Sequence, residues 1–132
     1  QINTYTTSWQ SEPHVDADSN GNLIVVWQSD GSPEDGGDTD DSSIQGRMYY
    51  ANGDPHLQQF QVNTTATGAQ QEPSVSFIAD LGDVPSIVAV ALWTDYDEPD
   101  PETVTQDVQA KIYDISVVIF ADDFETGDTS YW

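Results

Sequence analysis

The hydrophobic and polar positions along the chain follow the short periods of β-strands. Residues 23–27 (LIVVW) and 87–93 (IVAVALW) are apolar at nearly every position, which indicates strands covered on both faces. Residues 44–50 and 105–113 alternate instead, which predicts strands with one wet face that carries the basic residue of each strand. No segment shows the i, i+3, i+4 spacing of an amphipathic helix. The pattern therefore predicts an all-β chain.

Several blocks of the sequence occur twice in the same order. Residues 1–4 (QINT) match residues 61–64 (QVNT). The other matches are 10–13 (QSEP) with 70–73 (QQEP), Trp27 with Trp93, and 44–49 (IQGRMY) with 108–113 (VQAKIY). Matched blocks in a constant order are the signature of an internal repeat. We therefore predict a first β-repeat over 1–60, a second over 61–114, and an extra strand with a tail over 115–132.

Two such repeats predict a β-sandwich-like domain of antiparallel strands, with two propeller-blade-like sheets as the alternative. Turn signals at 18–21 (DSNG) and 51–55 (ANGDP) separate the strands of the first repeat. We expect Trp27 and Trp93 in the core, where truncation to Ala typically costs about 3–5 kcal/mol. The apolar strand 115–120 has no counterpart in the first repeat, so it needs a partner in its own sheet or in a neighbouring subunit.

The charge limits the possible partners. The chain has 24 acidic residues against two basic ones, a net charge of −22. Such a surface repels phosphate backbones and anionic membranes, so we expect neither nucleic-acid binding nor membrane insertion. Charges at this density also oppose compaction, so divalent cations, high salt or a neighbouring subunit must screen them. A halophilic source would explain the total equally well.

Each apolar strand that ends in tryptophan is followed by a stretch rich in carboxylates. The candidate metal ligands are Asp30, Asp35, Asp38, Asp40 and Asp41 in the first repeat and Asp95, Asp97, Asp100 and Glu102 in the second. Clustered carboxylates raise one another's pKa or attract a hard cation, and Ca²⁺ takes about six to eight oxygen ligands in flexible geometry. We expect at least one of these loops to bind Ca²⁺, the alternative being a solvated acidic loop.

A second calcium candidate precedes the first apolar strand. Asp16, Asp18 and Asn20 begin a D-x-D-x-N-G segment like that of an EF-hand loop. The closing glutamate is missing because Trp27 stands at the twelfth position. A hairpin turn is therefore favoured over a calcium loop.

Other polar residues suggest anchoring and modification rather than catalysis. Arg47 and Lys111 are the two basic residues and occupy the same repeat position, so we expect each to anchor its acidic loop through a carboxylate. Asn63 begins an N-x-T glycosylation acceptor pattern. No nucleophile–base set and no G-x-S-x-G motif is recognisable, so an enzyme is not expected.

The run VDADSNGNLIVVWQSDG, followed by SSIQGRMYYANGDPHLQQFQVNT, resembles a repeat of large secreted bacterial surface proteins. In those proteins a D-x-D-G-N turn precedes a VVVWQS strand, and an I-x-G-Q-R-F-D-A-x-G strand-turn and an F-x-V-N-T strand follow. The resemblance covers about residues 1–113 and is weaker in the second repeat. The loops here are longer and more acidic, and two copies are too few to close a propeller. The tail FADDFETGDTSYW also resembles a DGFESGD-like segment of bacterial exoproteins.

The resemblance implies an extracellular all-β module, in tandem, of adhesin-like or calcium-binding exoproteins. Together with the charge, it predicts a cation-stabilised structural or adhesive module in a larger array or filament, joined by strand addition. The alternative is a carbohydrate-binding module of a secreted protein, with glycans stacking on Trp9, Tyr96, Tyr131 or Trp132.

Overall fold

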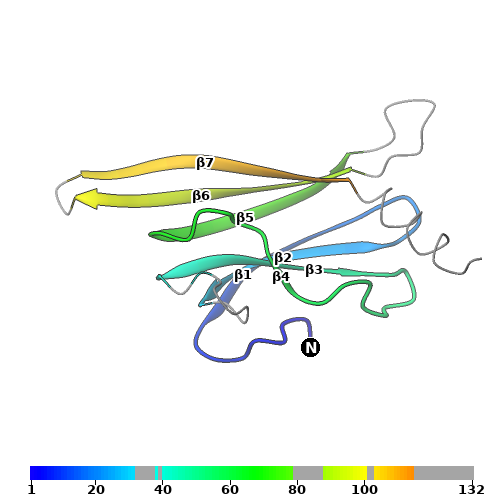
Figure 1. The fold of residues 1–132 in the computed structure, drawn as a ribbon. Helices are drawn as coiled ribbons and strands as arrows, with labels where there is room; N and C mark the ends of the chain where they lie inside the picture. The colour runs from blue at the N-terminus through cyan, green and yellow to red at the C-terminus, as the bar shows by residue number, and fades with distance from the viewer. Residues whose placement is uncertain (32–37, 39, 79–87, 101–102, 115–132) are drawn as a thin grey trace, which may run out of the picture.

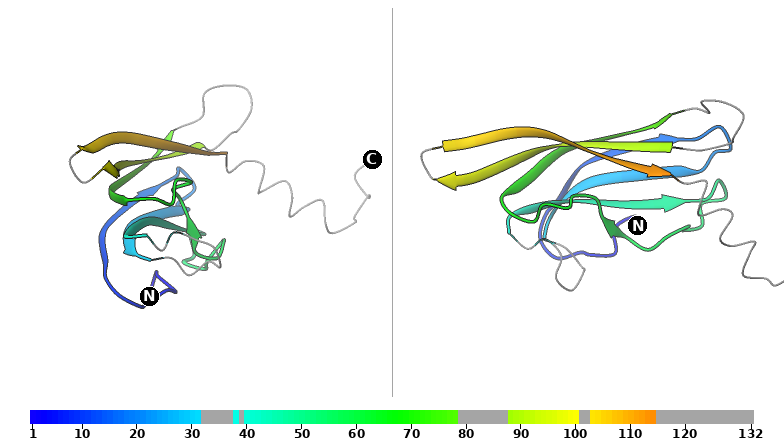
Figure 2. Two further views of the ribbon diagram at one scale, coloured as in Figure 1. Left: turned by 60° about the vertical axis from the view of Figure 1, so that its left-hand side comes forward. Right: turned by 45° about the horizontal axis from the view of Figure 1, so that its top comes forward.

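The computed structural model describes residues 1–31, 38, 40–78, 88–100 and 103–114, and it describes residues 97–100 and 103–104 by their backbone alone. This part of the chain contains no helix, and its strands form two antiparallel sheets that lie one above the other (Figure 1). The left-hand view of Figure 2 shows the same two layers from another side. The predicted all-β, sandwich-like class is confirmed.

Both sheets are meanders in which consecutive strands are neighbours. The first sheet has the order β1-β2-β3-β4 and the second the order β5-β6-β7. The strands are β1 Gln10–Ala17, β2 Leu23–Asp30, β3 Ser42–Tyr49, β4 Phe60–Gln61, β5 Ala69–Ile78, β6 Val88–Asp100 and β7 Thr103–Asp114. The change from one sheet to the other thus falls close to the boundary between the two sequence repeats.

Glycines form the two predicted turns of the first sheet. The Gly21 N–H donates to the Asp18 carbonyl at 3.0 Å, and the Gly53 N–H donates to the Tyr50 carbonyl at 2.8 Å. Both glycines have positive φ, at 85° and 89°. A side chain is strained in that conformation, which explains why glycine stands at both turns.

The second acidic stretch differs from the loop that we predicted. The strand β6 continues past Trp93 to Asp100, and β7 begins at Thr103, so the carboxylates stand on a long hairpin. The register shifts between Asp97 and Asp100, where Pro99 lies. Proline is tolerated at such an irregularity because it has no N–H to donate to the ladder. Cross-strand pairing therefore overrides the low strand propensity of the acidic residues.

The repeat in the sequence is also a repeat of the backbone. Ser8 and Gly68 are equivalent and have φ of 63° and 72°, and the equivalent Glu12 and Glu72 have φ of 50° and 55°. Each glutamate lies where the register of its strand pair shifts. Positive φ is uncommon outside glycine, so the shared values show that both copies adopt the same local conformation.

Side chains alternate along each strand, so each sheet has two faces. We call one the tryptophan face: it carries Val25, Trp27, Arg47 and Tyr49 in the first sheet and Ala91, Trp93, Lys111 and Tyr113 in the second. We call the other the aliphatic face: it carries Ile24, Val26, Ile44 and Met48 in the first sheet and Val90, Leu92, Val108 and Ile112 in the second.

The core between the sheets joins unlike faces. The first sheet contributes Ile24, Val26, Ile44, Met48 and Val62, and the second contributes Val75, Ala89, Ala91 and Trp93. The aliphatic face of the first sheet therefore packs on the tryptophan face of the second. This arrangement is a repeated step in one direction, because a two-fold relation would bring like faces together.

Residues 1–9 cover the tryptophan face of the first sheet, on the side away from the second sheet (Figure 1). Arg47 Nη1 donates to the Ile2 carbonyl at 2.8 Å. Trp27 is consequently buried, like Trp93, and the core position predicted for both is confirmed. The wet face predicted for β3 is wrong: every residue of that strand is buried, because the N-terminal segment takes the place of solvent.

Candidate functional site

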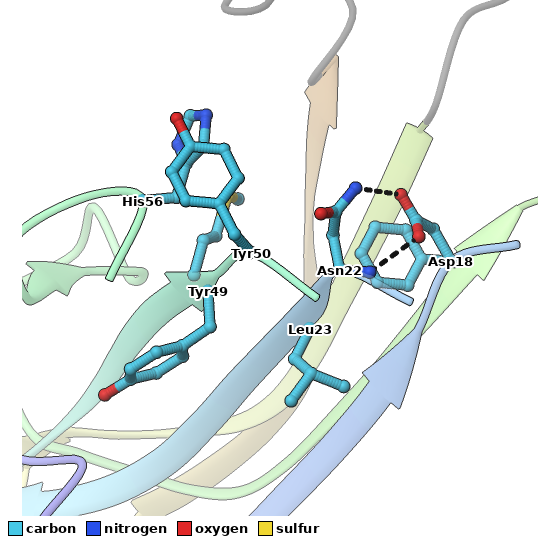
Figure 3. A pocket seen from close by; sticks show the side chains of 8 residues that line it. Asp18, Asn22, Leu23, Tyr49, Tyr50 and His56 are labelled. Carbon is cyan, nitrogen blue, oxygen red and sulfur yellow. Dashed lines mark hydrogen bonds between the residues drawn. The ribbon is translucent and has the colours of Figure 1, made fainter. Parts of the chain in front are cut away.

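A small pocket lies beside the turn that joins β1 to β2 (Figure 3). It is lined by Asp18, Asn22, Leu23, Met48, Tyr49, Tyr50, His56 and Phe77. The His56 ring packs edge-on against Tyr50 with ring centroids 4.4 Å apart. The pocket has a volume of about 40 Å³, which admits a few water molecules at most. It therefore offers no room for a sugar or another organic ligand.

The carboxylates of the D-x-D-x-N-G segment point to different partners. Asp18 accepts hydrogen bonds from the backbone N–H and the side chain of Asn22, both at 2.8 Å (Figure 3). It also accepts one from the Asn20 N–H at 2.8 Å. Asp16 accepts one from the Phe77 N–H of the second sheet at 2.7 Å, which lowers the pKa of Asp16. These contacts are those of the favoured hairpin turn, and they do not gather Asp16, Asp18 and Asn20 around one ion.

The predicted ligands of the acidic stretches occupy different environments. Asp30 is half-buried, Asp40 and Asp41 are exposed, and Asp38 and Asp95 are buried. The side chains of Asp97 and Asp100, and the whole of Asp35 and Glu102, lie outside the described residues. Among the residues that are described, no group of three or more potential ligands comes together. Calcium binding stays a prediction.

The two buried carboxylates, one from each acidic stretch, are linked through two amide side chains. Asn63 Nδ2 donates to Asp38 Oδ2 and to Gln70 Oε1, both at 2.8 Å. Gln70 Nε2 donates to Asp95 Oδ1 at 3.1 Å. We call Asp38, Asn63, Gln70 and Asp95 the amide bridge. Burial raises the pKa of Asp38, and the charges of Asp40 and Asp95 act in the same direction.

The amide bridge also fixes the backbone between the sheets. The Ile44 N–H donates to Asn63 Oδ1 at 2.8 Å, and the Ser42 hydroxyl donates to the Gln70 carbonyl at 2.9 Å. Strand β3 of the first sheet is thereby tied to β5 of the second. Sequence reasoning missed both amides in this role, although Asn63 and Gln70 stand in the repeated blocks Q-x-N-T and Q-x-E-P, which was the available signal.

The environment of Asn63 bears on the predicted glycosylation. The residue is 3% exposed, and its side-chain nitrogen also donates to the Thr65 carbonyl at 2.7 Å. A glycan on this nitrogen is incompatible with the packing of the folded chain, because it would break the amide bridge and separate the sheets. An acceptor pattern in the sequence carries no information on burial.

Arg47 and Lys111 make the same contact in successive repeats. Arg47 Nη1 donates to the Ile2 carbonyl at 2.8 Å, and Lys111 Nζ donates to the Val62 carbonyl at 3.2 Å. Each cation also lies over the ring of the tyrosine two residues further along its strand, at 5.3 and 5.5 Å from the centroid. Main-chain carbonyls therefore take the place of the predicted carboxylate anchors within the described part of the chain.

The aliphatic face of the second sheet is the most unusual surface in the described structure. Its exposed fractions are 42% for Leu92, 77% for Val108 and 69% for Ile112. The equivalent Val26, Ile44 and Met48 of the first sheet are at most 7% exposed. The sequence predicted cover on both faces of residues 87–93, but β6 is covered on its tryptophan face alone within this part of the chain. Contiguous exposed apolar side chains are typical of an interaction surface.

The predicted stacking aromatics are only partly available. Trp9 is 78% exposed, whereas Tyr96 is half-buried in β6. Tyr131 and Trp132 lie outside the described residues. Of the predicted stacking residues within the described part of the chain, Trp9 alone is exposed.

No protein-family model matches this chain, and the searches of curated proteins and of solved structures give no significant match. The described residues contain no helix long and apolar enough to cross a membrane.

Proposed function

We propose that the chain is a structural or adhesive repeat module of an extracellular array, held together by stacking of its sheets and stabilised by counter-ions. The observation that carries the proposal is the repeated step between the sheets. Lys111 of the second sheet donates to the Val62 carbonyl, and the equivalent Arg47 of the first sheet donates to the equivalent Ile2 carbonyl. A sheet of this type receives the preceding unit on its tryptophan face and the following unit on its aliphatic face.

Nearest-neighbour stacking of this kind can be extended without any new type of contact. Repeat proteins of this sort expose the face that the next unit would cover, and the exposed Leu92, Val108 and Ile112 fit that description. The resemblance to repeats of secreted bacterial surface proteins supports an extracellular location and a structural or adhesive role.

The charge supports the need for counter-ions. A net charge of −22 opposes both folding and association, and divalent cations such as Ca²⁺ reduce that repulsion most effectively. The amide bridge adds to this need, because it holds two buried carboxylates with neutral amides alone between them. Binding of Ca²⁺ in the acidic stretches would stabilise the folded chain by mass action.

Sedimentation velocity and electron microscopy of the full chain over a wide concentration range test this function. We expect oligomers that lengthen with concentration, and more so in Ca²⁺ than in NaCl of equal ionic strength. Thermal unfolding with Ca²⁺, with Mg²⁺ and with EDTA separates specific binding from general screening. A compact monomer at every concentration and in every salt would contradict the array.

Carbohydrate binding is the second candidate, and the exposure of Trp9 is the observation that favours it. Aromatic side chains commonly serve at binding surfaces because they combine a large apolar face with a polar edge. A glycan array probed in Ca²⁺ with the native chain and with Trp9→Ala tests this function. Binding that Trp9→Ala abolishes would support it, and an array without hits would remove it.

A further inference from the structure

We propose that the aliphatic face of the second sheet binds the N-terminal segment and tryptophan face of a second copy of this chain, so that copies join head to tail. The inference rests on the proposed structural-repeat function and names the partner and the two surfaces that meet. Its template is the interface between the two sheets within one chain.

Within one chain, the segment around Val62 is shared by both sheets. The Val62 N–H donates to the Ile44 carbonyl at 2.7 Å, which continues the pairing of Gln45 with Gln61 between β3 and β4. The Val62 carbonyl in turn accepts from Lys111 of the second sheet. The Val62 side chain is fully buried in the common core.

Ile2 is the repeat equivalent of Val62, but it has only half of these contacts. Its carbonyl accepts from Arg47, as the Val62 carbonyl accepts from Lys111. Its side chain is nevertheless 40% exposed, against 0% for Val62. Ile2 therefore contacts the first sheet as Val62 contacts the second, but no strand among the described residues pairs with it as β3 pairs with the segment around Val62.

Asn3 repeats the same half-complete pattern. Asn3 Nδ2 donates to the Tyr5 carbonyl at 2.8 Å, as Asn63 Nδ2 donates to the Thr65 carbonyl at 2.7 Å. Asn63 Oδ1 additionally accepts the Ile44 N–H of the preceding sheet. Tyr5 and Thr65 are themselves equivalent positions, so the local turn is the same and the cross-sheet bond is what differs.

The residues that would complete these contacts are found in the second sheet. Val108 is the repeat equivalent of Ile44, and Ile112 is the equivalent of Met48. In the described part of the second sheet, β7 is the last strand, whereas its counterpart β3 pairs with β4. Residues 1–2 of a second copy would lie beside β7 as Gln61 and Val62 lie beside β3, and Ile2 would cover Val108 as Val62 covers Ile44.

The two surfaces lie on different ends of the stack, so the contact is heterologous. Such a contact does not close on itself in a pair, and it propagates into an open chain unless the rotation per step closes a ring. The net charge of −22 on each copy makes association depend on salt, because screening removes long-range repulsion without weakening apolar contact. Association should therefore strengthen as the ionic strength rises.

Cysteine cross-linking tests the contact directly, because the chain has no cysteine of its own. Full chains carrying Ile2→Cys and full chains carrying Val108→Cys are mixed and oxidised gently. We expect a covalent dimer of one of each, because directly opposed residues of paired strands have Cβ atoms about 4.5–5.5 Å apart, within disulfide reach or close to it. Ser19→Cys replaces Val108→Cys in the control, since Ser19 is an exposed residue of the turn between β1 and β2, outside both assigned surfaces.

Neutral substitutions test the same surfaces without adding charge. Val108→Gln with Ile112→Gln removes one surface, and Ile2→Gln removes the other. We expect each variant to weaken self-association by on the order of tenfold or more, as loss of apolar burial implies. Because each variant keeps one intact surface, a mixture of the two should form heterodimers that do not grow further. Ser19→Gln, in the exposed turn between β1 and β2, should associate like the native chain.

The outcomes separate this inference from the function on which it rests. Cross-linking between positions 2 and 108, together with the loss caused by Val108→Gln and Ile112→Gln, supports both. Native association that these variants leave unchanged overturns the assigned surfaces and keeps the array. Absence of association at any concentration and salt overturns both.

Discussion

The two sheets are built from one repeated plan, yet they differ in burial. The first sheet is covered on its tryptophan face by residues 1–9 and on its aliphatic face by the second sheet. The second sheet is covered on its tryptophan face, while Val108 and Ile112 of its aliphatic face meet solvent in the described structure. Equivalent apolar residues thus have opposite environments. Position in the stack decides burial, and the residue type alone does not.

Truncation of the two core tryptophans should give the largest effects and show that both tryptophan faces are covered. We expect Trp27→Ala and Trp93→Ala each to lower the free energy of unfolding by about 3–5 kcal/mol, because each empties a buried site. Urea unfolding followed by circular dichroism measures this. Trp9→Ala is the control, with an expected change within about 0.5 kcal/mol because Trp9 is exposed. A Trp27→Ala effect as small as that of Trp9→Ala would show that residues 1–9 do not cover the first sheet.

Substitution at equivalent positions of the two aliphatic faces should show the difference in burial between the sheets most clearly. Ile44→Ala should cost about 2–5 kcal/mol, because Ile44 is fully buried in the common core. Val108→Ala should change the free energy of unfolding by about 0.5 kcal/mol or less in dilute solution. Chemical denaturation at low protein concentration provides both values. Equal costs at the two positions would mean that the second aliphatic face is already covered in the monomer.

Substitution of the two equivalent asparagines should give a smaller difference in the same direction. Asn63→Ala leaves the Ile44 N–H and the Asp38 carboxylate without their buried partner, which should cost about 1–3 kcal/mol. Asn3→Ala removes one local hydrogen bond to the Tyr5 carbonyl, with an expected cost of about 0.5–1.5 kcal/mol. Thermal unfolding with calorimetry compares them. A larger cost for Asn3→Ala would contradict the half-complete pattern at the N-terminus.

The pH dependence of stability should show the smallest effect. Burial raises the pKa of Asp38 above its ordinary value of 3.8, so the folded chain binds this proton more tightly than the unfolded chain. The free energy of unfolding therefore falls as the pH rises from about 3.8 to the raised pKa, and the cost of the buried charge is constant above it. Asp38→Asn should remove this part of the slope in urea titrations between pH 3 and pH 7.

Asp16 provides the matched contrast for that measurement. Its pKa is lowered by the Phe77 N–H, so its stabilisation is present above about 3.8 and is lost as the pH falls through the lowered pKa. Asp16→Asn should flatten the acid side of the profile and leave the slope assigned to Asp38 in place. Identical profiles for the two variants would show that neither carboxylate has the environment described.

Much of the fold could be predicted because it depends on local patterns. The strands around Val25 and Ala91, the turns at Gly21 and Gly53 and the doubled blocks all follow from nearest-neighbour preferences and alternation. The length of the β6–β7 hairpin could not be predicted, since its acidic residues have low strand propensity and become strand by pairing with β7.

The candidate site was predicted less well, because it depends on contacts between residues distant in the chain. The composition indicated which carboxylates were crowded, but it did not indicate that Asp38 and Asp95 lie within the same buried bridge. The wet and dry sides of β3 and β7 were assigned from alternation. Alternation identifies two faces without saying what covers either: the face of Arg47, predicted to be wet, is buried in β3, and Ile112 on the opposite face of β7 is 69% exposed.

The sequence by itself determined that the chain is all-β, that it contains an internal repeat, and that it carries a net charge of −22. These properties follow from residue periods, from repeated blocks and from composition, which need no knowledge of the fold. The tertiary structure alone decided that the second unit stacks on the first in the same sense, that Asn63 is a buried connector, and that one aliphatic face is exposed. The physical reason is that a side chain is buried only where two surfaces pack together, and the pattern within one strand describes only one of these surfaces.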